Sequence, residues 1–235
     1  MFGSFIPNHI NNRTVAGFLD LLRRIQRRFR ISRRYCRRHV NDNRIAIDRL
    51  LGSFGETEKK GSFPAYLEKQ NNYRNISYGR SDMAYAGCEI IAVYNALLNL
   101  GFRVDLSDMI DHFEHDGMVL SGRFGTAPYA MRDYLKSRGL TVETVFDPDG
   151  YDEVSRRAKV SILMLYNDRR SIFRKIHTIC ITKGSDGLTA HNMYGDGRPL
   201  GPYSDINELI GSINEGYAKG IVMFGIRDGS DTTVL

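Results

Sequence analysis

Cys88, His177 and Asn192 are the residues of this sequence whose types and order could do chemistry. A cysteine sulfur can attack a carbonyl carbon, and an imidazole can take up the thiol proton and later donate a proton to the leaving group. A third polar side chain can bond the other ring nitrogen and hold the imidazole in one orientation. The order of the three residues therefore predicts a thiol hydrolase that cleaves peptide or amide bonds through a thioester.

The position of Cys88 is set by the stretch MAYAGCEIIAVYNALLNLG, residues 83–101, in which the apolar spacing predicts a helix from Cys88 to Leu100. Gly87 allows the chain to turn sharply before that helix. Unpaired backbone N–H groups at a helix N-terminus favour a thiolate, so we expect the pKa of Cys88 to lie below its usual value. The alternative is a buried cysteine that packs like a small hydrophobic residue.

A predicted hairpin carries the histidine and the asparagine: the strand HTICITK, the turn GSDG and the strand LTAHNM. A turn of two or four residues places His177 and Asn192 on the same face of the sheet, so that Asn192 can reach the imidazole. His191 then points the other way. A turn of three or five residues reverses these faces. Asp196 has the same parity as Asn192 and is the reserve candidate.

The chain from about residue 65 onward predicts an α+β domain in which helices come first and mostly antiparallel strands follow. Besides the helix that begins at Cys88, helices are predicted at LSDMIDHFEH, with Ser107 as N-cap, and at TAPYAMRDYLKS, YDEVSRRA and DINELIGSI. Strands are predicted at LTVETV, VSILMLY, HTICITK, GLTAHNM and GIVMFGI. The helix that bears the nucleophile is expected to pack on this sheet.

Residues 1–60 form a predicted basic extension and linker, and residues 61–235 form the domain itself. The extension holds 14 Lys and Arg against 5 Asp and Glu, a net charge of +9, whereas the remaining chain has a net charge of −3. The stretch TVAGFLDLLRRIQRRFRISRRYCRRHV predicts a basic amphipathic helix, and LGSFGETEKKGSFP predicts a linker. The apolar face of that helix consists of Val15, Phe18, Leu19, Leu22, Ile25 and Phe29.

The basic helix has three interpretations. It can pack its apolar stripe on the domain and leave its arginines in solvent. It can be a pro-segment or autoinhibitory arm, attracted to the acidic domain and lying over the groove. It can also contact an anionic membrane surface or a nucleic acid. An apolar face of Phe, Leu and Ile suits a membrane or a protein better than a nucleic acid, and we find no recognisable nucleic-acid-binding module.

The composition of the chain bears on the cellular compartment of the protein and on the cofactors that it could bind. The three cysteines, Cys36, Cys88 and Cys180, do not form a disulfide framework, which favours a reducing compartment. We find no run of about 18 apolar residues and no secretory signal, so we expect a cytoplasmic protein. His112 and His115 could ligate zinc from one helical face, but no second ligand cluster accompanies them. We therefore predict neither a metal nor another cofactor.

The layout resembles papain-fold cysteine peptidases, and most of all the bacterial branch that includes the bacteriocin-processing (double-glycine) peptidases. Four pieces carry the resemblance: AGCEIIAVYNALLNLG, FGTAPYAMRDYLKSRGLTVETV, VSILMLY and HTICITKGSDGLTAHNM. They are similar to the nucleophile helix, a helix–Gly–strand unit, the strand before the histidine, and the histidine hairpin. The resemblance spans about Ser77 to Ile226. It implies Cys88 as nucleophile, His177 as base and acid, Asn192 as orienting residue, and a peptide or protein substrate.

Two features differ from the family pattern. The family usually has a glutamine five or six residues before the cysteine, which donates to the oxyanion, whereas this chain has Asp82 and Met83 there. A carboxylate cannot donate, so Asn75 or the backbone N–H of Cys88 is the candidate substitute. The family also has Gly and Pro after the cysteine, and this chain has Glu-Ile. An inactive peptide-binding module, a deamidase or an acyl transferase on the same scaffold therefore stays an alternative.

Overall fold

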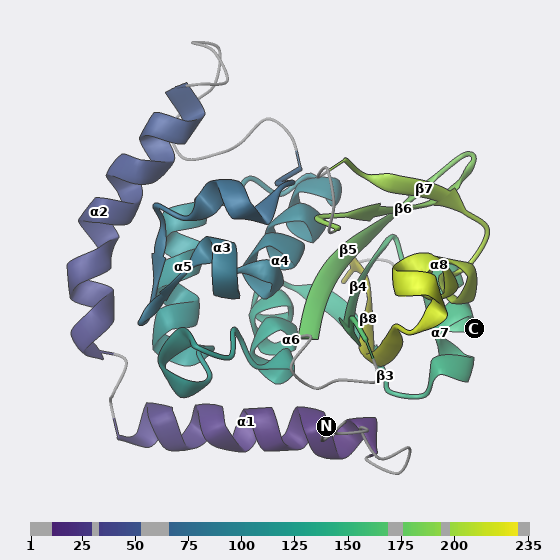
Figure 1. Cartoon of the computed structure of the whole chain (residues 1–235), viewed down its shortest axis with the longest axis horizontal. Coiled ribbons are helices and arrows are strands. Elements are labelled where there is room, and N and C mark those ends of the chain that lie inside the picture. The colour runs from purple at the N-terminus through teal and green to yellow at the C-terminus, as the bar shows by residue number, and fades with distance from the viewer. Residues whose placement is uncertain (1–10, 30–32, 53–65, 169–175, 194–197, 230–235) are drawn as a thin grey trace, which may run out of the picture.

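An antiparallel sheet of six strands forms the centre of the molecule (Figure 1). The computed structural model describes residues 11–29, 33–52, 66–168, 176–193 and 198–229, excluding the side chains of 33–38 and 51–52. The strands are hydrogen-bonded in the order β3-β8-β4-β5-β6-β7, with every neighbour antiparallel. Their bounds are β3 (Leu140–Val145), β4 (Val160–Tyr166), β5 (Ile176–Gly184), β6 (Gly187–His191), β7 (Leu200–Tyr203) and β8 (Lys219–Asp228).

Helices cover both faces of the sheet, with α4, α5 and α6 on one side and α7 and α8 on the other (Figure 1). The predicted α+β class with a mostly antiparallel sheet is confirmed. The helices of the domain are α3 (Met83–Ala86), α4 (Cys88–Asn99), α5 (Leu106–Asp116), α6 (Pro128–Ser137), α7 (Tyr151–Arg157) and α8 (Ile206–Ser212). A small pair of strands, β1 (Ser77–Tyr78) and β2 (Ser81–Asp82), precedes α3.

The sheet separates two hydrophobic cores. Ile162 and Cys180 belong to the core under α4, whereas Leu163 and Ile179 belong to the core under α7 and α8. Successive residues of a strand point to opposite faces, so the central strands β4 and β5 supply both cores. This explains why VSILMLY is an almost continuous apolar run and why its type as a strand could be predicted from the sequence.

The β5–β6 hairpin decides which residues share a face. Lys183 pairs with Leu188, as a predicted turn of two or four residues requires. Cys180 pairs with His191, so His191 lies on the side of the sheet that faces α4. His177 is three residues from Cys180 and therefore points to the opposite side. The prediction that His177 and His191 point to different faces is confirmed.

Two predicted element boundaries were wrong. Helix α5 is capped by Asp105 and not by Ser107, because the Asp105 carboxylate accepts a hydrogen bond from the Asp108 N–H at 3.1 Å. The single basic helix of the extension is two helices, α1 (Asn12–Arg28) and α2 (Arg33–Gly52). The two helices pack on different parts of the domain, α1 on α6 and β8, and α2 on α5, so one straight helix could not satisfy both contacts.

The extension packs directly on the domain. Leu19 of α1 and Ile47 of α2 belong to the core that contains α4. The ring of His39 bonds the Glu114 carboxylate at 2.9 Å, and the Asn43 side chain bonds both backbone groups of Ser77. The predicted linker after α2 lies largely outside the described residues. In the part of the chain that the structure describes, the helices are too short or too polar to cross a membrane.

Candidate functional site

Cys88 is the first residue of α4, and the chain reaches it through a tight turn. Asp82 caps the preceding helix α3, accepting a hydrogen bond from the Tyr85 N–H at 2.9 Å. Gly87 joins the two helices, and a side chain there would collide with Met83, whose carbonyl oxygen lies 2.5 Å from the position of a β-carbon. Helix α4 is buried against β4 and β5. The acidic residue before the cysteine therefore serves to start α3.

The thiol of Cys88 is buried beside β5. It faces the backbone N–H and the hydroxyl of Thr178 and the carboxyl of Glu89. Burial, followed by the negative charge of Glu89, raises the pKa of Cys88 well above its usual value. The prediction of a lowered pKa was wrong, because removal of the thiol from water outweighs the helix dipole and the N–H of Thr178. At neutral pH the sulfur carries its proton.

That N–H also places the sulfur relative to the sheet. Backbone N–H groups of a strand lie in the plane of the sheet, so the thiol lies against the edge of β5. Pairing between β5 and β6 ends at Cys180, which leaves this edge beside Thr178 outside the ladder. The N–H in question belongs to the peptide bond that joins His177 to Thr178. The structure thus brings Cys88 to the start of β5, one peptide unit from His177.

The imidazole of His177 is buried and fixed by a backbone group. Its Nε2 lies 2.6 Å from the carbonyl oxygen of Asn192. A carbonyl oxygen only accepts, so Nε2 carries the proton and Nδ1 holds the lone pair. Burial lowers the pKa of His177 to about 4, against the opposite effect of the Asn192 carbonyl. His177 pairs with Leu165, which places the ring on the face that α7 and α8 cover.

The side chain of Asn192 does not take the predicted role. Asn192 follows β6 with a left-handed backbone conformation, φ 60°, and this turn directs its carbonyl oxygen at His177. Its side-chain amide bonds Gln70 instead, through the Gln70 backbone N–H and side-chain oxygen, each at 3.2 Å. The third member of the predicted triad is therefore a backbone carbonyl, held in place by the side chain of the same residue.

Gln70 is a residue of the site that sequence analysis missed. It lies in the short helix η1 (Gln70–Tyr73), and its Nε2 donates to the carbonyl of Ala84 in α3 at 3.1 Å. The side chain thus joins Asn192 to the helix that precedes Cys88. The family pattern places a glutamine five or six residues before the cysteine, whereas here the fold brings the more distant Gln70 into contact with α3. An isolated glutamine in a polar stretch gave no signal of this.

Glu89 is a second residue near Cys88 to which the sequence analysis assigned no role in the site. It is a buried acid, and burial raises its pKa to about 7, while the Cys88 thiol, the Thr126 backbone and the Thr178 hydroxyl act in the opposite direction. Glu89 Oε2 and Thr178 Oγ1 are both buried beside the Cys88 thiol. A buried acid with a raised pKa often marks a functional site. The signal in the sequence was an acid inside the apolar run CEIIAV.

Gly125 makes room for the Glu89 carboxylate. Gly125 has φ +65°, and a β-carbon there would lie 2.6 Å from Glu89 Oε2. We expect Gly125→Ala to lower the free energy of unfolding by about 3 kcal/mol, through backbone strain and this collision. Gly139→Ala is the matched control, because Gly139 has φ +81° but open space around it. It should cost about 1 kcal/mol in urea unfolding. Equal losses would contradict the placement of Glu89.

His191 has structural partners of its own. Its Nε2 bonds the hydroxyl of Thr182 at 2.9 Å, and its Nδ1 bonds the carboxylate of Glu68 at 2.8 Å. The second oxygen of Glu68 accepts from the backbone N–H of Asn192. Glu68 therefore anchors the end of β6, and through it the carbonyl that holds His177. The reserve candidate Asp196 lies outside the described residues.

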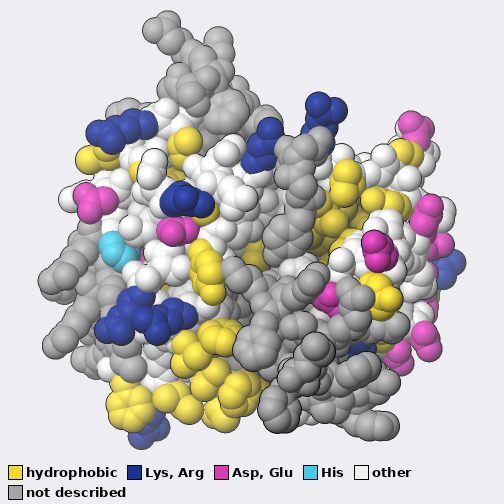
Figure 2. Space-filling model, in the orientation of Figure 1, with side chains coloured by type: hydrophobic (Ala, Val, Ile, Leu, Met, Phe, Trp, Pro, Cys, Tyr) yellow, Lys and Arg dark blue, Asp and Glu magenta, His cyan; other side chains and the backbone are white. Residues whose placement is uncertain are grey.

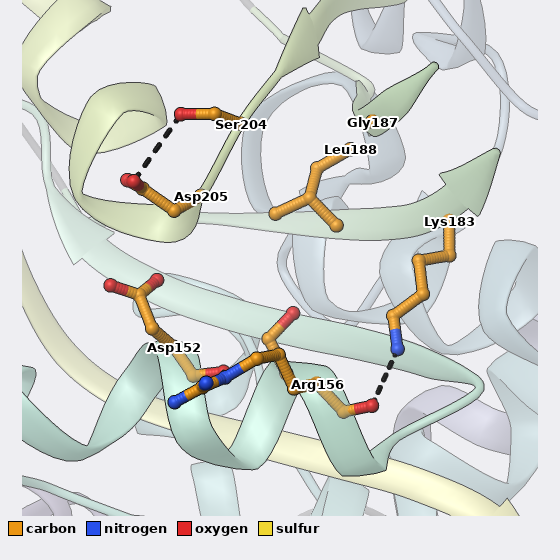
Figure 3. Close-up of a pocket in the computed structure, with 8 residues that line it drawn as sticks. Asp152, Arg156, Lys183, Gly187, Leu188, Ser204 and Asp205 are labelled. Carbon is orange, nitrogen blue, oxygen red and sulfur yellow. Dashed lines mark hydrogen bonds between the residues drawn. The ribbon is translucent and has the colours of Figure 1, made fainter. Parts of the chain in front are cut away.

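A surface hollow of about 470 Å³ lies elsewhere, between α7, the β5–β6 hairpin and the start of α8 (Figure 3). Lys183 reaches across it, and its Nζ donates to the Arg156 carbonyl at 2.7 Å. Asp152 on the same helix accepts from the backbone N–H of Ile206 at 2.7 Å. These contacts join α7 to the hairpin and to α8. Lys183 and Asp152 therefore have a structural role in this hollow.

The predicted residues thus lie at the start of α4, near the start of β5 and just after β6, with the Cys88 thiol on the α4 side of the sheet and the His177 ring on the α7 and α8 side. Among the described residues, we find no group of three or more His, Cys, Asp and Glu side chains arranged to hold a metal ion. The ring of His112 packs on Tyr134. In comparisons with known proteins, no family model and no curated protein matches this chain.

Proposed function

We propose that this protein is a papain-like thiol hydrolase that cleaves peptide or amide bonds, with Cys88 as nucleophile and His177 as general base and acid. The observation that carries the proposal is the contact between the Cys88 thiol and the peptide N–H of His177–Thr178. The neighbouring ring is held by the Asn192 carbonyl at 2.6 Å and keeps Nδ1 as its basic nitrogen. The nucleophile and the oriented imidazole therefore lie at adjacent positions along β5, the thiol on the side of α4 and the ring on the side of α7 and α8.

Cys88 and His177 are both neutral before the reaction, so the thiol proton must move during the attack on the substrate. As the sulfur attacks the substrate carbonyl carbon, the thiol proton passes to Nδ1 of His177. The tetrahedral intermediate collapses, the carbon–nitrogen bond breaks, and His177 gives that proton to the departing amine. A water molecule then attacks the thioester, passes its proton to His177, and releases the carboxyl product. The proton on His177 returns to the sulfur, so the enzyme is unchanged after one turnover.

The start of α4 supplies the oxyanion stabilisation that this reaction needs. The first backbone N–H groups of an α-helix have no partner within the helix, and they favour negative charge. The N–H of Cys88 is the first of these groups in α4. The side-chain amide of Gln70, a residue of η1, donates to the Ala84 carbonyl of α3 next to this turn. We assign to it the oxyanion-binding role of the glutamine in the family pattern.

A peptidyl vinyl sulfone tests the proposal, because it forms a stable thioether with an activated cysteine. We expect mass spectrometry of the labelled protein to find the adduct on Cys88 and not on Cys180, which is also buried and has a raised pKa. A mixture of peptides incubated with the protein should yield cleavage products. Cys88→Ser removes both signals. Failure to form an adduct on Cys88, together with failure to cleave any peptide, would overturn the proposal.

A peptide-binding module without activity is the second candidate. The burial of Cys88 and its raised pKa favour it, since a buried neutral thiol is a poor nucleophile. This candidate predicts that the peptide mixture is retained by the protein without cleavage. It also predicts that Cys88→Ser leaves the retention unchanged.

A further inference from the structure

The face through which helix α1 packs on the domain includes buried polar side chains, which is unusual for a simple amphipathic helix. Its buried residues include two polar ones, Asp20 and Gln26, beside Ala16 and Leu19. Gln26 accepts a hydrogen bond from the Ser121 N–H at 2.6 Å. Polar and small side chains therefore hold much of this helix in place.

One side of the apolar face of α1 is left in solvent. Phe18 is 57% exposed, Leu21 53%, Ile25 45% and Phe29 69%. Their spacing of three, four and four residues places them in one stripe along the helix. The first of the interpretations drawn from the sequence, an apolar stripe packed on the domain, therefore holds for one half of the predicted face and not for Phe18, Ile25 and Phe29. Val15, Leu19 and Leu22 form the half that packs on the core.

The stripe continues onto the domain. The short helix η2 (Leu120–Gly122) contacts α1, and the nearby side chains of Leu120 and Phe124 are 48% and 62% exposed. Figure 2 shows hydrophobic side chains gathered along the lower edge of the molecule, where α1 lies in Figure 1. An exposed apolar patch of this kind usually marks a surface that binds a partner.

Arginines border the stripe and indicate the partner. Arg24 and Arg28 follow Leu21 at intervals of three and seven residues, so they lie along its edge. The side chain of Arg24 is 73% exposed although it also bonds Asp20. Helix α1 holds five arginines and one acid. An apolar stripe with arginines beside it fits a lipid surface, where side chains enter the acyl region and arginines meet phosphates.

We propose that α1 is a membrane-binding element that lies in the plane of an anionic lipid surface. Phe18, Leu21, Ile25 and Phe29 enter the boundary between headgroups and acyl chains, and Arg24 and Arg28 contact the lipid phosphates. Arg23 and Arg27 instead pair with Asp133 and Asp116 of the domain. The packed face of α1 holds the rest of the protein against that surface. The inference is independent of the chemistry of Cys88, because α1 contacts α6, β8 and η2.

Binding of the full chain to vesicles tests the inference. We expect cosedimentation with vesicles of equal parts phosphatidylcholine and phosphatidylserine, and much weaker binding to phosphatidylcholine alone. Ile25→Ser should weaken binding about tenfold, and Arg28→Ala about fivefold. Ile45→Ser and Arg156→Ala are the matched controls, since they remove an exposed isoleucine of α2 and an exposed arginine of α7. Both controls should bind like the unchanged protein.

Fluorescence gives a readout that does not need a destabilising change. The chain contains no tryptophan, so Phe18→Trp introduces a single reporter in the stripe. Its emission should shift to the blue and resist quenching by acrylamide when anionic vesicles are added. Tyr85→Trp, at an exposed position of α3, should show neither change.

Three outcomes would overturn the inference. The first is absence of binding to anionic vesicles. The second is binding that Ile25→Ser leaves unchanged, or that occurs without a blue shift of the Phe18→Trp emission. The third is a dimer in light scattering that dissociates when Ile25 is changed, since the stripe would then be covered by a second copy of the chain.

Discussion

Replacement of His177 by alanine is expected to lower the rate of thioether formation and of peptide cleavage by about 10²–10⁴-fold, the contribution of a general acid–base group. The reason is the protonation state of the resting site. The raised pKa of Cys88 keeps the proton on sulfur, so attack on a carbonyl requires a base during the reaction. His177, whose proton lies on Nε2, is the residue that the proposal assigns as that base.

The pH dependence follows from the pKa of His177. The imidazole acts as a base only when it is neutral, and burial lowers its pKa from 6.5 to about 4. The rate should therefore stay high as the pH falls through 6.5 and decline only near pH 4. An activity that declines near pH 6.5 would show that the working base is another group or a solvated histidine.

His191→Ala is the matched control for this experiment. His191 is also buried, on the strand next to β5, and bonds Thr182 and Glu68. Its loss is expected to reduce stability and to leave the rate of the folded fraction within a few-fold. His177→Gln keeps a hydrogen-bond donor for the Asn192 carbonyl but removes the basic nitrogen. It therefore separates loss of the base from loss of the fold. If His177→Gln retains full activity, His177 is a structural residue.

The second expected result concerns stability and pH: Glu89→Gln should make the free energy of unfolding rise by about 3 kcal/mol between pH 4.5 and 6.5. Two buried groups act against each other in this range. The pKa of Glu89 is raised by burial from 4.5 to about 7, so the unfolded chain ionises first and stability is lost as the pH rises through that interval. Glutamine removes this loss.

His177 contributes the opposite slope. Its pKa is lowered from 6.5 to about 4, so the unfolded chain binds the proton first as the pH falls. The stability that this group contributes is complete above pH 6.5 and is lost toward pH 4. In the unchanged protein the two slopes nearly cancel between pH 4.5 and 6.5. Glu89→Gln leaves the slope of His177, and His177→Gln leaves the slope of Glu89.

Urea unfolding at several pH values measures these slopes. Stability of Glu89→Gln should increase with pH, and stability of His177→Gln should decrease with pH by a similar amount. Glu153→Gln, at an exposed carboxyl of α7, is the control and should keep the flat profile. A flat profile in Glu89→Gln would mean that the carboxyl is hydrated in solution, and the account of the site around Cys88 would need revision.

Much of the fold could be predicted because the signals are local. The strand VSILMLY and the helix that begins at Cys88 follow from runs of apolar residues and from Gly87. The parity of the hairpin followed from a short turn, since each residue of a strand alternates in direction. The helix boundaries at Asp105 and Phe29 were less predictable. At Asp105 more than one residue could cap the helix, and at Phe29 the helix ends because α1 and α2 pack on different parts of the domain.

The sequence by itself therefore determined the types of the elements and the places of Cys88 at the start of α4, His177 near the start of β5 and Asn192 just after β6. Only the tertiary structure decided three further properties. Burial, and not the helix dipole, sets the pKa of Cys88, because desolvation depends on every element packed around the thiol. A backbone carbonyl holds His177, because the chain turns at Asn192. The domain covers a mixed face of α1, which leaves the stripe of Phe18, Leu21, Ile25 and Phe29 exposed.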